Sequence, residues 1–258
     1  MNKEKISKYF ERINLKQDLD NIVLDLELLK KIQYSHVMNI PYENIDIANN
    51  IPLDLDNDKL FEKMIINNRG GYCFEINSLY NWLLCELGYK TTSYMSRYLR
   101  GELEIPMRRH RVIAVESDLI SGRILCDAGV GERAPKHPLL IEEGIIQEQF
   151  GETYRFEKDE FFGWLLTDYH KGEWKPYYSF TEEPQLDIDY VMPSFYCEKH
   201  PDSPFNKKFM IEIKTPDGRK TLNDNVFHIF KSGNMDELVI DNDELLRNIL
   251  REHFYIKI

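Results

Sequence analysis

Cys73 is the residue of this chain best placed to do chemistry. It follows Gly70 and Gly71, which favour a tight turn, and stands where a helix is predicted to begin. Backbone N–H groups at a helix start have no intrahelical partner and carry partial positive charge, so they favour an anion. A thiol at this position leans toward thiolate, the form that attacks carbon. The segment predicts a cysteine nucleophile, although packing alone is an equal alternative on this motif.

His110 and Asp127 can supply the base and the orienting group that a cysteine nucleophile needs. His110 stands at the entry of a predicted strand, Arg111–Glu116, and Asp127 ends the next apolar run along the chain. Two adjacent strands can bring an imidazole and a carboxylate within hydrogen-bonding distance. That pairing would favour imidazolium, which would lower the pKa of the Cys73 thiol further.

Each of these residues also has a structural explanation. His110 lies among arginines and is consistent with an exposed strand end, and Asp127 precedes a glycine, where aspartate commonly caps a turn. Cys85 lies within the predicted helix and Cys126 within a strand, so both are expected to be inert core thiols. Cys197 receives no role. The combination of a cysteine, a histidine and an aspartate is what favours a catalytic site.

The composition excludes several classes of function. The 258 residues include 33 Lys and Arg against 44 Asp and Glu, a net charge of −11, which disfavours nonspecific binding to nucleic acid or anionic membranes. The first residues mix charges, so no signal peptide is expected, and no apolar run approaches the roughly 20 residues that span a membrane. The cysteine and histidine spacings indicate neither disulfides nor a metal site. We expect a cytoplasmic protein with reduced thiols.

Hydrophobic spacing divides the chain into a helical part, a strand-rich part and a mixed part. Helices are predicted at 3–13, 25–38 and 58–67, and from Cys73 to Leu87, with Gly88 as the stop. The predicted strands are Thr91–Leu99, Arg111–Glu116, Arg123–Asp127, Thr153–Glu157, Phe161–Asp168 and Lys175–Phe180. From about Asp187 a helix, a hairpin turning at 215–218 and a last helix at 242–253 are predicted. Many short strands indicate an antiparallel barrel or sandwich.

Several segments together resemble the arylamine N-acetyltransferase family. The family's hallmarks are Ile-Pro-Phe-Glu-Asn, Arg-Gly-Gly-x-Cys-x-Glu-x-Asn, a strand histidine and Asp-x-Gly-Phe-Gly. The corresponding segments here are Ile40-Pro-Tyr-Glu-Asn44, Arg69 to Asn77, His110, and Asp127-Ala-Gly-Val-Gly131, with further similarity at Tyr178–Pro184, Ser203–Lys208 and Thr215–Gly218. The resemblance covers most of the chain in order, and the motifs together are far more specific than any single one.

The resemblance implies an α+β architecture in three parts. These are a helical bundle at 1–88 that carries the nucleophile, an antiparallel β-barrel at 89–192 that carries the histidine and aspartate, and an interdomain segment with an α/β lid at 193–258. It also implies a ping-pong reaction that moves acetyl from acetyl-CoA through a Cys73 thioester to arylamines, arylhydrazines or N-hydroxyarylamines, with a role in xenobiotic metabolism. His110 would be the acid–base group and Asp127 its orienter, without a metal.

The resemblance also assigns binding residues. Tyr42, Val130 and Phe205 would line the acceptor pocket, and Arg108 and Arg109 would meet the phosphates of the coenzyme. Val130 departs from the family pattern, because an aromatic residue usually stands there. Loss of a ring removes a stacking surface worth roughly 0.5–1.5 kcal/mol beyond area burial. We therefore expect a wider, less aromatic pocket with a different acceptor preference.

The resemblance also bears on three charged residues. Glu43 and Arg69 would form a structural ion pair, and Glu132 stands where some members of the family carry a basic residue.

Three alternatives remain open at this point. A cysteine hydrolase or transglutaminase-like enzyme shares the order of cysteine, histidine and aspartate; papain-type proteases are disfavoured because His110 follows Cys73 by only 37 positions. An amide synthase of the same fold would use a different acyl donor. An inactive binding module would keep the fold without the chemistry.

Overall fold

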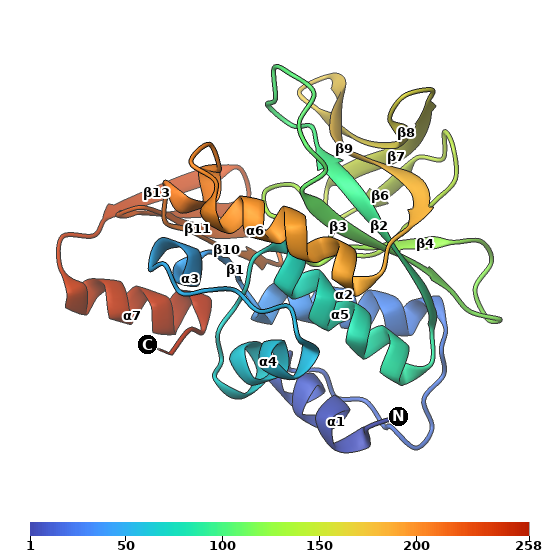
Figure 1. Cartoon of the computed structure of the whole chain (residues 1–258), viewed down its shortest axis with the longest axis horizontal. Coiled ribbons are helices and arrows are strands. Elements are labelled where there is room, and N and C mark those ends of the chain that lie inside the picture. Colours follow the sequence, from blue (N-terminus) through green and yellow to red (C-terminus); the bar gives the residue numbers. More distant parts are fainter. Residues whose placement is uncertain (258) are drawn as a thin grey trace.

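The computed structural model describes residues 1–257. In Figure 1 the strand-rich part lies at the upper right, with the N-terminal helices below it and the C-terminal sheet to its left. The N-terminal elements are α1 (Lys3–Arg12), α2 (Leu26–Asn39), β1 (Tyr42–Glu43), α3 (Ile45–Ala48), α4 (Asn57–Phe61), a π-helical turn (Glu62–Ile66) and α5 (Cys73–Leu87). The helices expected at 3–13 and 25–38 and the one starting at Cys73 are confirmed. The segment expected at 58–67 is helical but changes from α to π geometry after Phe61.

Helix α5 is central because it carries Cys73 at its first position. Its start is fixed by the carboxylate of Glu75, which accepts a hydrogen bond from the backbone N–H of Tyr72 at 3.1 Å. Its end is fixed by Gly88, which adopts the left-handed conformation (φ 107°) that glycine tolerates best. The apolar stripe of the helix is fully buried in the same core cluster as residues of α1 and α2. The nucleophile candidate therefore stands on a rigid element.

The strand-rich part forms an eight-stranded antiparallel sheet that curls into a nearly closed barrel. Its strands are β2 (Lys90–Tyr98), β3 (His110–Glu116), β4 (Ile124–Cys126), β5 (Leu139–Leu140), β6 (Gln147–Gln149), β7 (Glu152–Asp159), β8 (Gly163–His170) and β9 (Glu173–Pro184), in the order 5-4-3-2-9-8-7-6. The two edge strands, β5 and β6, are joined through a side chain. The amide nitrogen of Gln147 donates to the carbonyl oxygen of Leu140 at 2.9 Å, and the amide oxygen accepts from the backbone N–H of Leu140 at 2.8 Å.

The C-terminal part is a sheet backed by one helix. After a 3₁₀ turn (Asp187–Tyr190), α6 (Val191–Lys199) and a second 3₁₀ turn (Pro204–Asn206) come β10 (Met210–Thr215), β11 (Gly218–Asn223), β12 (Val226–Lys231), β13 (Asn234–Val239) and α7 (Asp243–Phe254). The short strand β1 pairs with β10, so the N-terminal part contributes the edge of this sheet. Figure 1 shows α7 along one side of the sheet, where Ile249, Leu250 and Phe254 are buried against its apolar face.

The structure agrees with the predicted α+β fold and the predicted strands, with shifts of a few residues. The hairpin expected at 215–218 connects β10 and β11, and the last helix is α7. One expectation is wrong: Cys85 is exposed, whereas Cys126 is buried as expected. Cys85 follows Leu84 in sequence, but successive residues of a helix point in different directions, so its side chain faces away from the apolar stripe. The boundaries 1–88, 89–192 and 193–258 stay a prediction.

No helix within residues 1–257 combines the length and the apolar character needed to cross a membrane.

Candidate active site

Cys73 is buried at the start of α5, next to the first residues of β3. Its Sγ lies 3.7 Å from the carbonyl oxygen of Arg109, the residue before His110. Gly129 allows the neighbouring loop to come close, because a Cβ there would lie 2.9 Å from the carbonyl oxygen of Cys73. The tight packing brings helix α5, strand β3 and the loop after β4 to one point.

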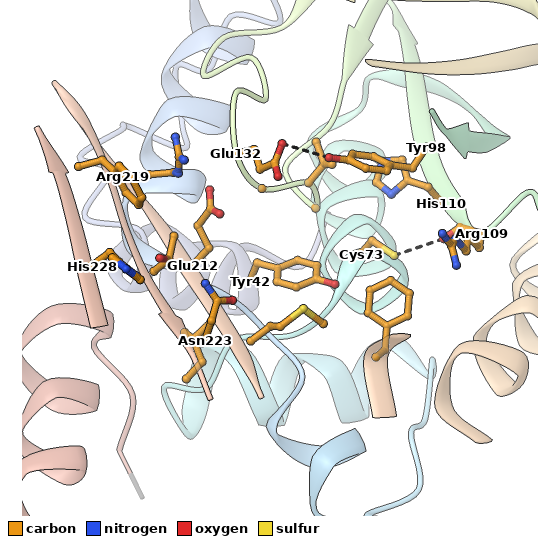
Figure 2. Close-up of a pocket in the computed structure, with 18 residues that line it drawn as sticks. Tyr42, Cys73, Tyr98, Arg109, His110, Glu132, Glu212, Arg219, Asn223 and His228 are labelled. Atoms are coloured by element: carbon orange, nitrogen blue, oxygen red, sulfur yellow. Dashed lines mark hydrogen bonds between the residues drawn. The ribbon is translucent and has the colours of Figure 1, made fainter. Parts of the chain in front are cut away.

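His110 and Asp127 are hydrogen-bonded as the adjacent strands predicted. Nε2 of His110 lies 2.7 Å from Oδ2 of Asp127, and both side chains are buried. Figure 2 shows His110 on the side of the cavity where Cys73 lies, and both residues line that cavity. Because Nε2 faces the carboxylate, Nδ1 is the ring nitrogen that remains for a reacting group.

Two residues that hold Asp127 received no role from the sequence. Asn77 donates to Oδ1 of Asp127 at 2.8 Å and accepts from the N–H of Ala128 at 3.0 Å. Gln33 accepts the N–H of Asp127 itself at 3.1 Å. Asn77 stands four residues after Cys73, a spacing that places both on one face of a helix, and this signal was available in the sequence. Gln33 lies in α2, which is far from Asp127 in the sequence, so no spacing pattern indicated this contact.

The environment of the sulfur differs from the expectation of a lowered pKa. Burial raises the pKa of the Cys73 thiol well above its ordinary value, because a thiolate there loses its hydration, and the charge of Asp127 raises it further. The backbone N–H of Phe74, at the helix start, acts in the lowering direction but is outweighed. A lone thiolate is therefore disfavoured at this site, and a thiolate needs a cation such as a protonated His110 beside it.

A cavity of about 390 Å³ opens in front of Cys73 between the barrel and the C-terminal sheet (Figure 2). The three residues expected to line an acceptor pocket, Tyr42, Val130 and Phe205, all line it. The rest of the lining is Tyr98, Arg109, Gly129, Gly131, Glu132, Met210, Ile211, Glu212, Arg219, Thr221, Asn223, His228 and Phe230, together with Cys73 and His110. The strands β10 to β12 thus supply much of a wall that the sequence did not indicate.

The two arginines expected to meet coenzyme phosphates differ in position. Arg109 lines the cavity, and its guanidinium lies 2.5 Å from a carboxylate oxygen of Glu102. Arg108 is not among the residues that line the cavity and lies 3.3 Å from Glu183. Both guanidinium groups already have carboxylate partners, so an anionic ligand would have to compete with these ion pairs.

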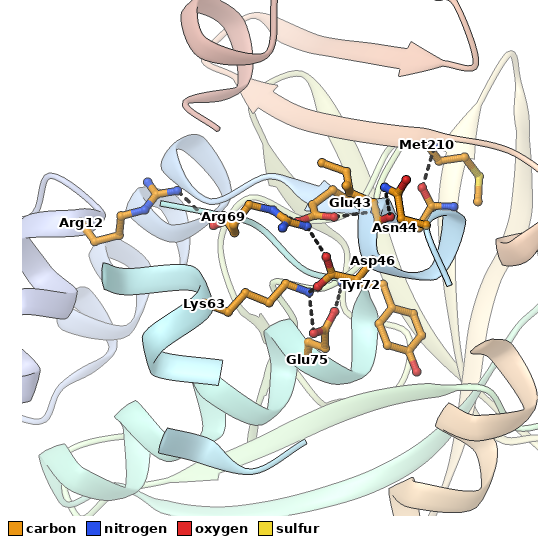
Figure 3. Close-up of polar contacts among 11 residues, drawn as sticks. Arg12, Glu43, Asn44, Asp46, Lys63, Arg69, Tyr72, Glu75 and Met210 are labelled. Atoms are coloured by element: carbon orange, nitrogen blue, oxygen red, sulfur yellow. Dashed lines mark hydrogen bonds and ion pairs between the residues drawn. The ribbon is translucent and has the colours of Figure 1, made fainter. Parts of the chain in front are cut away.

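A buried charge network lies behind the start of α5 (Figure 3). The expected ion pair of Glu43 and Arg69 is confirmed at 2.8 Å, and Arg69 also lies 2.8 Å from Asp46. Lys63 extends the network, because its Nζ lies 2.6 Å from Asp46 and 2.7 Å from Glu75. Since Glu75 also holds the N–H of Tyr72, the network ties the residue before Cys73 to two neighbouring segments.

Comparison with known proteins gives one consistent family. The sequence model of a family described as N-acetyltransferase matches residues 25–258. An arylamine N-acetyltransferase of Mycobacterium tuberculosis is 30% identical over 257 residues, which cover 98% of this chain and 89% of that protein. An arylamine N-acetyltransferase of Mycolicibacterium smegmatis is 33% identical over 224 residues, covering 84% of this chain and 80% of that protein.

Solved structures agree with the sequence relatives. The structure of the enzyme from Salmonella typhimurium, an arylamine N-acetyltransferase, superposes with a TM-score of 0.90 at 27% identity and covers 98% of this chain and 91% of that one. The Mycobacterium marinum arylamine N-acetyltransferase in complex with CoA gives a TM-score of 0.87 at 28% identity, covering 97% and 92%. With sequence, family model and fold in agreement over nearly the whole chain, this protein belongs to the arylamine N-acetyltransferase family.

Proposed function

We propose that the protein transfers an acetyl group from acetyl-CoA to an arylamine through a thioester on Cys73. Family membership supports the reaction class, and the related M. marinum protein supports CoA as the product of the donor. Arylhydrazines and N-hydroxyarylamines are the further acceptors in this proposal; a Salmonella relative of 30% identity is named as an N-hydroxyarylamine O-acetyltransferase as well. A cytoplasmic location and a role in xenobiotic metabolism stay predictions.

The first half-reaction forms the acetyl-enzyme. His110 takes the proton of Cys73, and Sγ attacks the carbonyl carbon of acetyl-CoA to give a tetrahedral intermediate. Backbone N–H groups near the start of α5 are candidate donors to its oxyanion. The bond from carbon to the CoA sulfur then breaks, and His110 returns the proton to that sulfur. One thioester replaces another, so this step is close to balanced in free energy.

The second half-reaction releases the product. The acceptor amine attacks the acetyl carbon on Cys73 while His110 takes the amine proton, and collapse of the intermediate breaks the bond to Sγ. The proton then returns to the Cys73 thiolate, which restores the enzyme. Asp127 orients the imidazole through its hydrogen bond to Nε2 and stabilises the positive charge that the ring acquires. Formation of an amide from a thioester makes this half-reaction favourable.

The observation that carries the proposal is that Cys73 and an Asp127-bound His110 line one cavity that is open to a ligand. Tyr42, Val130 and Phe205 are the proposed contacts of the acceptor in that cavity. Of the two arginines proposed for the coenzyme, Arg109 is the better placed, because it lines the cavity and Arg108 does not.

Intact mass after incubation with acetyl-CoA tests the proposal. The wild type is expected to gain one acetyl group that disappears when an arylamine is added, and Cys73→Ser is expected to gain none. Cys85→Ser is the matched control, because this exposed thiol is the one most open to nonenzymatic acetylation. Persistence of the adduct in Cys73→Ser would contradict the proposal, and peptide cleavage without an adduct would favour a hydrolase. An adduct formed only with another acyl donor would favour an amide synthase.

The pH dependence of alkylation tests the proposed pairing of Cys73 with His110. In the wild type, the pH midpoint of alkylation at Cys73 is expected to lie below that of a free cysteine. In His110→Gln the midpoint is expected to move above that of a free cysteine, because burial raises the pKa of the unpaired thiol. His200→Gln, at an exposed histidine, is the control. Equal midpoints in the wild type and His110→Gln would show that His110 does not stabilise the thiolate.

A further inference from the structure

One face of the C-terminal sheet turns polar side chains toward the active-site cavity. Antiparallel pairing joins Glu212, Thr221 and His228 in one row across β10, β11 and β12, and directly paired residues lie on the same face. All three line the cavity. The alternate residues, such as Leu222 and Phe227, are buried in the core cluster that includes α7. The sheet therefore has one face that packs against the helix and one that faces a space available to ligands.

Polar atoms of this wall lack partners. Oε1 of Glu212, Nε of Arg219 and Nδ1 of His228 are buried and have no hydrogen-bond partner within residues 1–257. Buried polar groups in native proteins nearly always have a partner, so each exception calls for an explanation. Because the three residues line one cavity and come from three adjacent strands, a ligand in the cavity can reach all three. An anion supplies the acceptor that Nε of Arg219 lacks, whereas Oε1 of Glu212 needs a hydrogen-bond donor.

Arg219 is the charge of this wall that has no counterion. Glu212 lies 3.6 Å from Nζ of Lys214, and Nε2 of His228 lies 3.1 Å from Glu237. Across the described part of the chain, no carboxylate lies within 4 Å of the Arg219 guanidinium, which stacks 4.1 Å above the ring of Phe230. In Figure 2 its nitrogen atoms extend from β11 toward the interior of the cavity.

We infer that Arg219 forms an anion subsite and that it binds a carboxylate on the acceptor. The guanidinium offers parallel N–H donors that match the two oxygens of a carboxylate, and its stacking on Phe230 keeps the fork in one plane. This inference rests on the proposed function, because it assigns the acceptor class of the same site. Arylamines with an acidic group on the ring are therefore the preferred acceptors.

The size of the cavity agrees with a substituted ring. An apolar cavity of about 150 Å³ is large enough for benzene, so about 390 Å³ leaves room for a group beyond the ring. Tyr42 and Phe205 line the cavity together with Cys73 and supply aromatic rings to its wall. An acceptor whose amine faces Cys73 then directs the substituent opposite that amine toward the wall that carries Arg219.

A phosphate of the donor is the other anion to consider. The phosphates of CoA are separated from its sulfur by the whole pantetheine arm, whereas a ring carboxylate lies only a few bonds from the reacting amine. The shorter reach favours the acceptor as the source of the anion in a cavity of this size. The two sources also act in different half-reactions, so steady-state kinetics separate them.

The test compares 4-aminobenzoate with its neutral analogue 4-aminobenzamide in the wild type, Arg219→Gln and Arg219→Lys. In Arg219→Gln, kcat/KM for 4-aminobenzoate is expected to fall about 10- to 100-fold, the range for loss of a hydrogen bond to a charged group. The value for 4-aminobenzamide and kcat/KM for acetyl-CoA are expected to stay within about twofold. Arg219→Lys keeps the charge without the fork and is expected to lose less. Arg247→Gln, at an exposed arginine of α7, is the matched control.

Three results would overturn the inference. An equal loss with both acceptors would show that Arg219 does not recognise the carboxylate. A loss in kcat/KM for acetyl-CoA would assign the anion to the donor's phosphates, and no change with either substrate would show that the subsite is unused. Failure of the wild type to form an acetyl-enzyme would instead contradict the proposed function, and the mass measurement detects that outcome separately.

Discussion

Two regions near Cys73 contain buried charges, but only one of them has a complete set of partners. Behind the start of α5, Lys63 and Arg69 each contact two carboxylates at 2.6–2.8 Å. Across the cavity wall, the guanidinium of Arg219 contacts none within residues 1–257, and an oxygen of Glu212 lacks a hydrogen-bond donor. The first arrangement is complete without a ligand, and the second is complete only with one.

The difference separates structural charge from functional charge. Each charge of a buried ion pair has lost its hydration, and the attraction between the two charges compensates for that loss. Removing one partner leaves the other charge buried without this compensation. A charge whose partner is a ligand contributes little to the stability of the unliganded fold, because that partner is absent until the ligand binds. We therefore expect substitutions in the network to change stability and substitutions on the wall to change acceptor choice.

The largest effect is expected for Lys63→Met. This change keeps an apolar side chain of similar length but leaves Asp46 and Glu75 without their shared cation. Breaking a buried ion pair in this way costs about 3–5 kcal/mol. Urea unfolding measures the difference, and Lys59→Met, at an exposed lysine of α4, should stay within about 0.5 kcal/mol of the wild type. A loss no greater than that of the control would show that the network does not stabilise the fold.

Lowering the pH should relieve part of this loss. Burial raises the pKa of Glu75 in the wild type although Lys63 acts to lower it, so removing Lys63 raises this pKa further. A carboxyl with a raised folded pKa contributes stability that is fully present below its unfolded pKa and is lost as pH rises through the folded value. The difference between Lys63→Met and wild type in urea is therefore expected to shrink as pH falls from 7 toward the unfolded value of 4.5. A constant difference across that range would exclude protonation of Glu75 as the source of relief.

Local patterns in the sequence predicted the long helices, most of the longer strands and the three candidate catalytic residues, but not the short elements β1, α3, β5 and β6. Cys73 follows two glycines at a helix start, and His110 and Asp127 lie at the ends of neighbouring antiparallel strands, so local rules identified the three residues and the pairing of His110 with Asp127. The contact of the start of α5 with β3 did not follow from them. Asn77 was within reach of the same rules, because it lies one helical turn after Cys73.

Long-range pairing could not be predicted in this way. Tyr42 lies opposite Glu212, although 169 other residues separate them in the chain, and no local pattern specifies that pairing. The polar wall depends on it, as does the position of Arg219 in the cavity. The effect of burial on Cys73 was also out of reach, because a helix start favours thiolate in water whereas burial in this core raises the pKa of the thiol.

A smaller effect is expected on the apolar side of the cavity. Val130→Phe adds a ring next to the space proposed for the acceptor, and an aromatic pair contributes about 0.5–1.5 kcal/mol beyond area burial. We expect kcat/KM for flat, neutral arylamines to rise by about 2- to 10-fold, with stability nearly unchanged. Kinetics with a neutral arylamine measure the change. Equal or better turnover in the wild type would show that Val130 does not limit stacking in this pocket.

The smallest effect is expected for the stability of Arg219→Gln. The guanidinium has no carboxylate within 4 Å in residues 1–257, so its removal breaks no ion pair, and the buried Glu212, whose pKa burial raises and the charges of Lys214 and Arg219 lower, keeps Lys214 beside it. The free energy of unfolding without ligands should stay within about 0.5 kcal/mol of the wild type, the range for substitutions away from special features. Urea unfolding beside Lys63→Met gives the direct contrast. A loss of several kcal/mol would mean that Arg219 stabilises the fold, and the division between a structural network and a ligand-binding wall would then be wrong.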